Sequence, residues 1–185
     1  PMNTLSFPLS NQLVVVVAPH AAMPMMVEIA ARLALNGTVR VLDGGNRFNV
    51  YPVAQAVRRL TPRLEETLAR MTLSRAFTCY QVVALLEQTP VRAVPTLVLD
   101  ILSTFLDESV TFEESQRLLK VSIEHLQRLS QTAPVVVSVK PLLTLSAERL
   151  PLLDMLSEAA SRTILLETPR PQPSAALPLW QQGAD

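Results

Sequence analysis

Short apolar segments alternate with amphipathic stretches along most of this chain. Six such segments occupy residues 13–18, 39–43, 71–76, 96–101, 134–139 and 163–166. The first of them is continuous and rich in valine, a pattern typical of strands that are buried on both faces of a parallel sheet. We therefore expect each segment to form one strand.

The stretches between these segments carry helix start and stop signals. Pro24 suits the first turn of a helix that ends near Asn36-Gly37, while Thr78 and Thr111 each precede a glutamine or glutamate at capping-box spacing. The predicted helices span residues 24–35, 53–60, 62–70, 79–88, 112–129 and 147–160, the third with Thr61 as its cap. Alternating strands and helices predict an α/β fold, a three-layer and mostly parallel sheet covered by helices.

The chain divides into one core domain and two flanking segments. Its 185 residues suit a single domain, which we place at 12–167, after a lead-in at 1–11. Residues 168–185 carry four prolines and predict an extended tail. The tail contains Leu177, Leu179 and Trp180, which we expect to dock on the core or on another chain, because tryptophan is enriched at binding hot spots.

Charge and cysteine content narrow the classes of function. Basic and acidic residues balance at 16 each, whereas a protein that coats nucleic acid is usually basic. No apolar run approaches the ~20 residues that a membrane span needs. Cys79 is the single cysteine, which excludes an internal disulfide and favours an intracellular, cytoplasmic location.

The first strand, the loop after it and the next helix have the layout that holds nucleotide phosphates. That loop normally reads G-x-x-x-x-G-K-[ST], in which glycines let backbone N–H groups converge and the lysine reaches the outer phosphates. Here the two glycine positions are Ala18 and Met23, the lysine position is Pro24 and the hydroxyl position is Met25. Proline removes both a charge and an N–H donor, so the pattern predicts a degenerate loop.

Several polar residues are expected at the carboxyl edge of the sheet, where ligands of such folds bind. Asp43, Asn46, Arg47 and Asp100 follow strands, and they indicate either a remnant pocket or ordinary turn chemistry. Two further residues belong to the same region. His20 lies in the loop, where we favour a surface position over anion binding, and Lys140 ends the fifth strand and is the one lysine that could reach a ligand there.

Four segments carry a family resemblance: the first strand with its loop and helix, "VRVLDGGNRFNVYPVAQAVRRL", "LSRAFTCYQVVALLEQ" and "PTLVLDILSTFLDES". A fifth stretch, "APVVVSVKP", is similar to the strand before the family's second DNA-binding loop. From about residue 12 to 167 the chain resembles the RecA-like recombinase core, in its recombinase and RadA branch. The resemblance implies a sheet of the type found in P-loop NTPases.

The family's functional residues carry over only in part. The position of the magnesium-associated aspartate is Asp100, but the resemblance puts the water-activating glutamate at Gly45, where no general base is supplied. Three of the four groups that hydrolysis needs are missing. The two loops that bind DNA in the family correspond to an acidic stretch around 107–108 and to a short one at 141–146, so we expect no strong autonomous binding of nucleic acid.

The resemblance implies a non-catalytic RecA-like protein that works through protein contacts, in DNA repair or recombination. We expect a protein partner, as a homo-oligomer or a recombinase-like hetero-complex, and no catalytic residue, cofactor or metal. Two alternatives stay open. One is a module that binds a nucleotide or anion without hydrolysis, through Asp43, Asn46, Arg47 and Lys140; the other is an ATPase that a partner subunit completes.

Overall fold

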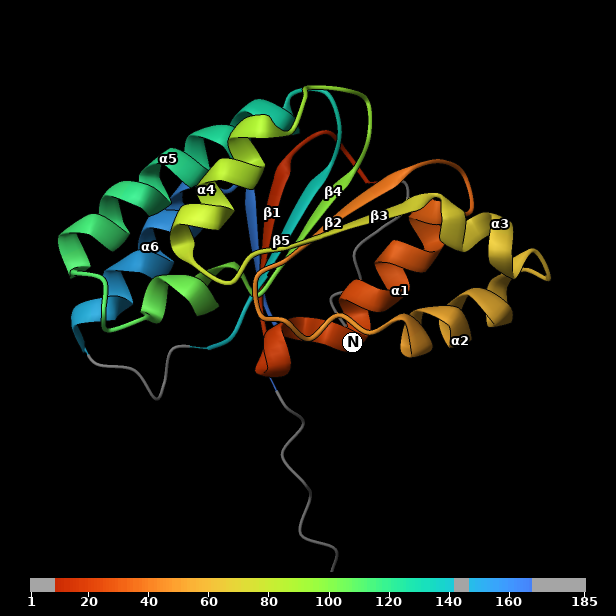
Figure 1. Ribbon diagram of the computed structural model, residues 1–185, viewed down its shortest axis with the longest axis horizontal. Coiled ribbons are helices and arrows are strands. Elements are labelled where there is room, and N and C mark those ends of the chain that lie inside the picture. The colour runs from red at the N-terminus through yellow and green to blue at the C-terminus, as the bar shows by residue number, and fades with distance from the viewer. Residues whose placement is uncertain (1–8, 142–146, 168–185) are drawn as a thin grey trace, which may run out of the picture.

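The chain folds around one six-stranded, fully parallel β-sheet (Figure 1). The computed structural model describes residues 9–141 and 147–167. Across the sheet the strands run in the order β3-β2-β4-β5-β1-β6. Their bounds are β1 Leu13–Val17, β2 Val39–Asp43, β3 Met71–Arg75, β4 Thr96–Leu99, β5 Val135–Val139 and β6 Arg162–Leu165.

Helices cover both faces of this sheet, so the expected three-layer α/β architecture is confirmed (Figure 1). One face is covered by α1 Met23–Ala34, α2 Val50–Leu60 and α3 Leu64–Ala69. The other is covered by α4 Cys79–Gln88, α5 Phe112–Ser130 and α6 Leu150–Ala159. Three short 3-10 helices complete the described elements: η1 Pro19–Ala22, η2 Ile101–Leu106 and η3 Ala147–Arg149.

The valine-rich β1 explains why its sequence does not alternate between apolar and polar residues. Val14 and Val16 belong to the core beneath α1–α3, whereas Val15 and Val17 belong to the core beneath α4–α6. Successive side chains of a strand point to opposite faces, and here both faces are buried. Every residue of this strand is therefore apolar and buried.

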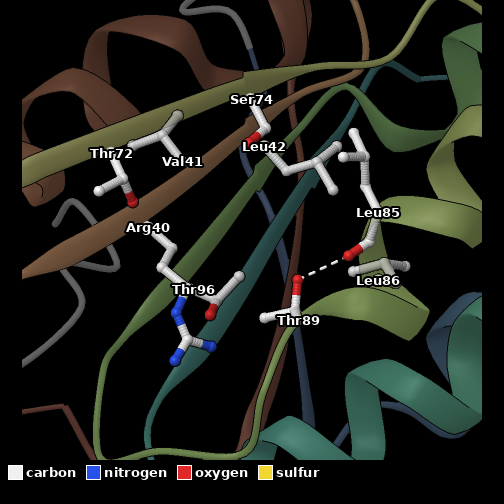
Figure 2. A pocket seen from close by; sticks show the side chains of 9 residues that line it. All are labelled: Arg40, Val41, Leu42, Thr72, Ser74, Leu85, Leu86, Thr89 and Thr96. Carbon is white, nitrogen blue, oxygen red and sulfur yellow. Dashed lines mark hydrogen bonds between the residues drawn. The ribbon is translucent and has the colours of Figure 1, made fainter.

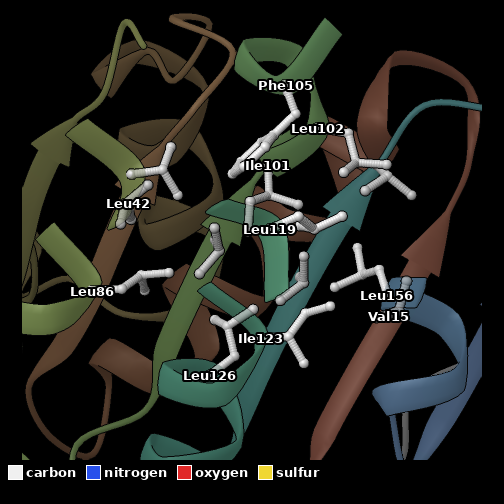
Figure 3. Close-up of a cluster of buried hydrophobic side chains, with 14 of the residues drawn as sticks. Val15, Leu42, Leu86, Ile101, Leu102, Phe105, Leu119, Ile123, Leu126 and Leu156 are labelled. Carbon is white, nitrogen blue, oxygen red and sulfur yellow. The ribbon is translucent and has the colours of Figure 1, made fainter. Parts of the chain in front are cut away.

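Edge strand β3 is covered less completely than the central strands, and four of its five residues are exposed. A cavity of about 70 Å³ lies beside it, between α4 and strands β2, β3 and β4 (Figure 2). Further toward the middle of the sheet the same layer is filled by apolar side chains such as Phe105, Leu119 and Leu126 (Figure 3).

Three of the element boundaries that differ from the sequence prediction have a clear local cause, a side-chain hydrogen bond in two cases and a backbone conformation in the third. The helix expected from 53 begins at Val50, because the Asn49 side chain accepts a hydrogen bond from Tyr51 N at 2.9 Å. The helix expected from 62 begins at Leu64, since the Thr61 hydroxyl accepts from Arg63 N and forms a turn instead of a cap. The fourth strand ends at Leu99, one residue before a left-handed backbone conformation (φ 51°) at position 100.

Other sequence signals are confirmed. Thr78 and Thr111 cap α4 and α5, with hydroxyl oxygens that accept from Gln81 N at 3.2 Å and Glu114 N at 3.3 Å. Pro24 lies in the first turn of α1. The tail residues predicted to dock, Leu177, Leu179 and Trp180, lie outside the described residues, as do positions 142–146 of the second predicted DNA-binding loop.

Candidate functional site

The loop between β1 and α1 has an unusual backbone. Ala18 N donates to Val139 O at 3.1 Å, which fixes the loop to the end of β5. His20, Ala21 and Ala22 then follow with φ values of 55°, 52° and 52°, all in the left-handed region. A residue with a Cβ pays roughly 1 kcal/mol or more for this conformation, so the turn is held by its surroundings and not by its own preference.

At five of the eight positions 18–25, this loop offers no free N–H group to a phosphate, because two residues are prolines and three N–H groups, including that of Ala18, are bonded within the protein. Pro19 and Pro24 have none. Ala21 N donates to Ala18 O at 3.1 Å, and Met23 N donates to His20 O. A phosphate site at a helix N-terminus depends on several N–H groups that converge on the anion, whereas several N–H groups of this loop are hydrogen-bonded within the protein.

The side chains of the loop do not replace the missing donors. Met23 and Met25 are half-buried and pack against the core beneath α1–α3. Pro24 is exposed, and so is the side chain of His20. Apolar side chains therefore occupy the positions at which the phosphate loop would carry a cation and a hydroxyl.

Asp100 and Lys140 meet at the carboxyl edge of the sheet, where the sequence predicted both. Lys140 Nζ lies 3.0 Å from Asp100 Oδ2, and the aspartate side chain is buried while the lysine is about one-third exposed. The ammonium is at ion-pairing distance, yet Oδ2 receives no well-aligned hydrogen bond among the described residues. The attraction is therefore mainly coulombic. Backbone N of Asp100 donates to Ser138 Oγ at 3.1 Å, which ties β4 to β5 at this point.

Gly45 packs directly against Asp100. A Cβ at position 45 would lie 2.8 Å from Asp100 Oδ2 and 2.9 Å from its Cβ, closer than real Cβ atoms approach. The position that corresponds to the family's glutamate thus has no room for a side chain while the aspartate keeps its place. The glycine is explained by close packing, since its φ is not positive.

Asp43 organises the turn after β2 and is fully buried. Its Oδ1 accepts hydrogen bonds from Gly45 N at 3.2 Å and Arg47 N at 3.3 Å, and its Oδ2 accepts from Phe48 N at 2.8 Å. A carboxylate that receives backbone N–H groups in this way fixes the chain around it. Both oxygens are consequently occupied by the protein.

Arg75 completes this cluster, and the sequence analysis missed it. Its Nη1 donates to Asp43 Oδ2 at 2.7 Å and to Asn46 Oδ1 at 3.1 Å, and its Nη2 donates to Phe48 O at 2.8 Å. The sequence carried only part of the signal: Arg75 lies at the end of the third apolar segment, but its place opposite Asp43 follows from the pairing of β3 with β2 in the structure.

The six predicted site residues therefore do not form one site. Asp43 and Asn46 belong to the Arg75 cluster, and Asp100 pairs with Lys140. The side chains of His20 and Arg47 are exposed, and no bond of either side chain is found within 9–141 and 147–167. Internal contacts thus engage both buried carboxylates, Asp43 with Arg75 and Asp100 with Lys140.

The environment of Cys79 and the positions of the potential metal ligands can be described for residues 9–141 and 147–167. Cys79 is buried in the core beneath α4–α6, and burial raises the pKa of its thiol. It behaves as a packing residue, because a reactive thiolate needs an exposed, electropositive setting. No group of three or more histidine, cysteine or carboxylate side chains is gathered for a metal ion within the described residues.

Comparison with protein-family models and with curated proteins found no match for this chain. The resemblance to the RecA-like core accordingly rests on the sequence segments quoted above, and the parallel α/β fold is consistent with it. Among the described helices, none combines the length and apolar character required to cross a bilayer.

Proposed function

We propose that this chain is a non-catalytic RecA-like protein that acts through contacts with other proteins. Its setting in DNA repair or recombination follows from the sequence resemblance alone. The observation that carries the proposal is the loop between β1 and α1, in which two prolines and two internally bonded N–H groups replace the donors of a phosphate cradle.

The absence of hydrolysis is supported at two further positions. Gly45 touches Asp100, so a water-activating carboxylate has no place at 45. Lys140 Nζ is 3.0 Å from Asp100 Oδ2, where it neutralises the buried carboxylate instead of facing a phosphate. Phosphoryl transfer depends on positioning and on charge neutralisation, and both are missing here.

The alternative of a nucleotide- or anion-binding module at this edge is less favoured by the same contacts. Asp43 and Asn46 are held by Arg75, and Lys140 is held by Asp100. Of the four residues that such a module would use, Arg47 alone keeps an exposed side chain without a bond among the described residues. One arginine gives a weak, salt-sensitive attraction and little specificity.

Protein contacts are supported by the surface around β3. This strand lies at an edge of the sheet, and its neighbour on one side is β2 while the other side is unpaired among the described strands. Phe77 and Tyr80, just beyond β3, expose 62% and 51% of their surface. An unpaired edge beside exposed aromatic side chains is a common basis for association with another chain.

Isothermal titration with ATP and magnesium tests the loss of nucleotide binding. We expect no heat of binding from a sample whose fold is verified by circular dichroism. Micromolar affinity that disappears in Lys140→Ala would contradict the proposal and favour the anion-binding module. Affinity that survives in Lys140→Ala would also contradict it, and would point to the loop itself.

Affinity purification with paired variants tests the role in protein contacts. We expect Phe77→Glu to lose a partner, or self-association measured by light scattering, that wild type retains. Tyr51→Glu is the matched control, because Tyr51 is 64% exposed but lies on α2, at the other face of the sheet. If both variants retain the partner equally, the β3 surface is not the site of contact.

ATP hydrolysis that appears only after the purified partner is added would favour an ATPase completed in trans. Tight binding of single-stranded DNA at physiological salt would contradict the expectation of no autonomous DNA binding.

A further inference from the structure

The cavity beside β3 is lined by an unusual number of polar side chains for a space under a helix. It is about 70 Å³ in volume and lies far from the loop after β1, toward the amino ends of the strands. Thr72 and Ser74 of β3 are exposed, so the cavity reaches the surface at the edge of the sheet. Its lining residues are Arg40, Val41, Leu42, Thr72, Ser74, Leu85, Leu86, Thr89 and Thr96.

Arg40 and Thr96 form the polar end of this cavity. They are register partners on the adjacent strands β2 and β4, and Thr72 is the partner of Arg40 on the opposite side. Figure 2 shows the guanidinium of Arg40 beside the Thr96 hydroxyl. Three polar side chains on one face of three neighbouring strands thus converge on one place.

Two of these polar groups are buried and unsatisfied. Nη1 of Arg40 and Oγ1 of Thr96 are shielded from solvent, and neither has a hydrogen-bond partner among the described residues. Thr96 as a whole is 3% exposed. Leaving a buried polar atom without a hydrogen-bond partner is unfavourable, so folded proteins rarely keep such atoms without a water or ligand to bind them.

The charge around the cavity is positive. Arg92 and Arg128 act on Arg40, and burial together with these two cations lowers the pKa of the Arg40 guanidinium. No aspartate or glutamate lines the cavity. Arg128 is already bonded to the carbonyl oxygens of Leu86 and Thr89, at 3.1 Å each, whereas the charge of Arg40 has no such compensation at Nη1.

We propose that this cavity binds one oxyanion, the phosphate or carboxylate group of a small molecule, between the Arg40 guanidinium and the Thr96 hydroxyl. A guanidinium offers N–H donors in a fork that matches either group, and a hydroxyl adds a further donor. The volume corresponds to about two waters at roughly 30 Å³ each, which suits a single anionic group but not a whole nucleotide. The site is independent of the proposed function and of the edge at which the family binds nucleotide.

The test compares thermal unfolding of the full chain in inorganic phosphate, in acetate and in chloride, at equal ionic strength. A ligand that binds the folded state raises the melting temperature with concentration, and screening acts equally in all three salts at one ionic strength. Phosphate also stabilises folded proteins through exclusion from their surface, so only the part of a response that Thr96→Val loses and Arg58→Met keeps counts as binding. We expect phosphate or acetate to raise the melting temperature above its value in chloride. A response to phosphate identifies a phosphate-type ligand, and a response to acetate alone identifies a carboxylate.

Two variants locate the effect. Arg40→Met keeps an unbranched, flexible stem but is shorter and removes the charge, and Thr96→Val keeps the shape and removes the hydroxyl. Each should weaken the anion about tenfold or more, since a hydrogen bond to a charged group is worth at least that factor. Each should also be no less stable than wild type in chloride, because the group that is removed was unsatisfied.

Arg58→Met is the control, as it removes the same charge from an exposed position on α2. It should respond to the anions as wild type does. An equal melting temperature in the three salts, or a full anion response in Thr96→Val, would overturn the proposal. Should Arg40→Met fail to fold, the isosteric Thr96→Val variant still decides between the outcomes.

Discussion

Two buried aspartates at the same edge of the sheet should respond very differently to the same change. Asp43→Asn and Asp100→Asn each replace a carboxylate by an amide of nearly equal size. Asp43 receives hydrogen bonds from three backbone N–H groups and from Arg75. Asp100 Oδ2 has a lysine 3.0 Å away but no well-aligned hydrogen bond among the described residues.

The expected magnitudes follow from these contacts. An amide at 43 offers one acceptor oxygen and an NH₂ group that faces existing donors, so two or more bonds are lost and Arg75 is left without its charge partner. Breaking a buried ion pair costs about 3–5 kcal/mol, and the partial exposure of Arg75 reduces this to about 2–4 kcal/mol. At Asp100 the lost attraction is offset by the removal of a buried charge, and Lys140 can turn to solvent, so we expect a change within about 1 kcal/mol.

Urea unfolding measures both variants against wild type under one condition. The free energies are compared at matched slopes, because a changed slope would mean that the folded or unfolded state itself had changed. A loss below about 1 kcal/mol for Asp43→Asn would refute the view that this residue holds the turn together. A loss for Asp100→Asn as large as that for Asp43→Asn would refute the assignment of a mainly coulombic contact to Lys140.

Three further predictions use other features of the core. Gly45→Ala should lower the free energy of unfolding measured in urea by about 1–3 kcal/mol, because the added Cβ would lie 2.8 Å from a side-chain atom. Gly37→Ala should be neutral or stabilising, since a Cβ there has nothing within 4 Å, and equal effects of the two variants would contradict the packing argument. Arg149→Met should lower the free energy of unfolding by about 3 kcal/mol or more, because the buried guanidinium of Arg149 donates three hydrogen bonds of 2.9 Å. A shift of the urea midpoint no larger than that of the exposed control Arg117→Met would contradict this prediction. Cys79 should react with a thiol reagent far more slowly in the folded protein than in urea, because its thiol is buried. Burial also raises the pKa of this thiol in the folded state, so its contribution to stability is present below the pKa of the unfolded state and is lost as the pH rises through the pKa of the folded state.

The layered fold was predictable because its signals are local and repeated. A continuous run such as β1 can be satisfied only where both faces are buried, and capping threonines such as Thr78 mark helix starts through one hydrogen bond within a few residues. The boundary errors also have local causes. At Thr61 the hydroxyl bonds to the N–H two residues later, which closes a turn and delays α3 to Leu64, and the sequence supports either arrangement equally.

The candidate site was predictable in its position but not in its connections. Residues that follow parallel strands meet at one edge, and Asp100 and Lys140 are indeed paired there. The grouping of Asp43 with Arg75 depends on which strand lies beside β2, a non-local fact that the sequence does not state. The unsatisfied polar atoms of Arg40 and Thr96 result from side-chain packing across three strands and a helix, which the periodicity of the sequence does not predict.

The two ends of the sheet differ in the charge of the groups that a ligand would meet, and this contrast supports both proposals. At the carboxyl edge, the charges that could have faced a nucleotide are directed at one another, as Asp43 with Arg75 and Asp100 with Lys140. A ligand could use these charges only by breaking the pairs, which would leave a buried charge without its partner. Buried polar atoms without a hydrogen-bond partner among the described residues occur at both ends: Asp100 Oδ2 and Thr104 Oγ1 at the carboxyl edge, and Arg40 Nη1 and Thr96 Oγ1 toward the amino ends of β2 and β4. The carboxylate oxygen repels an anion, whereas the guanidinium nitrogen attracts one. A bound anion gains most where it supplies missing hydrogen bonds and displaces none, so the cavity under α4 is a better place for a small oxyanion than the edge that the fold suggests.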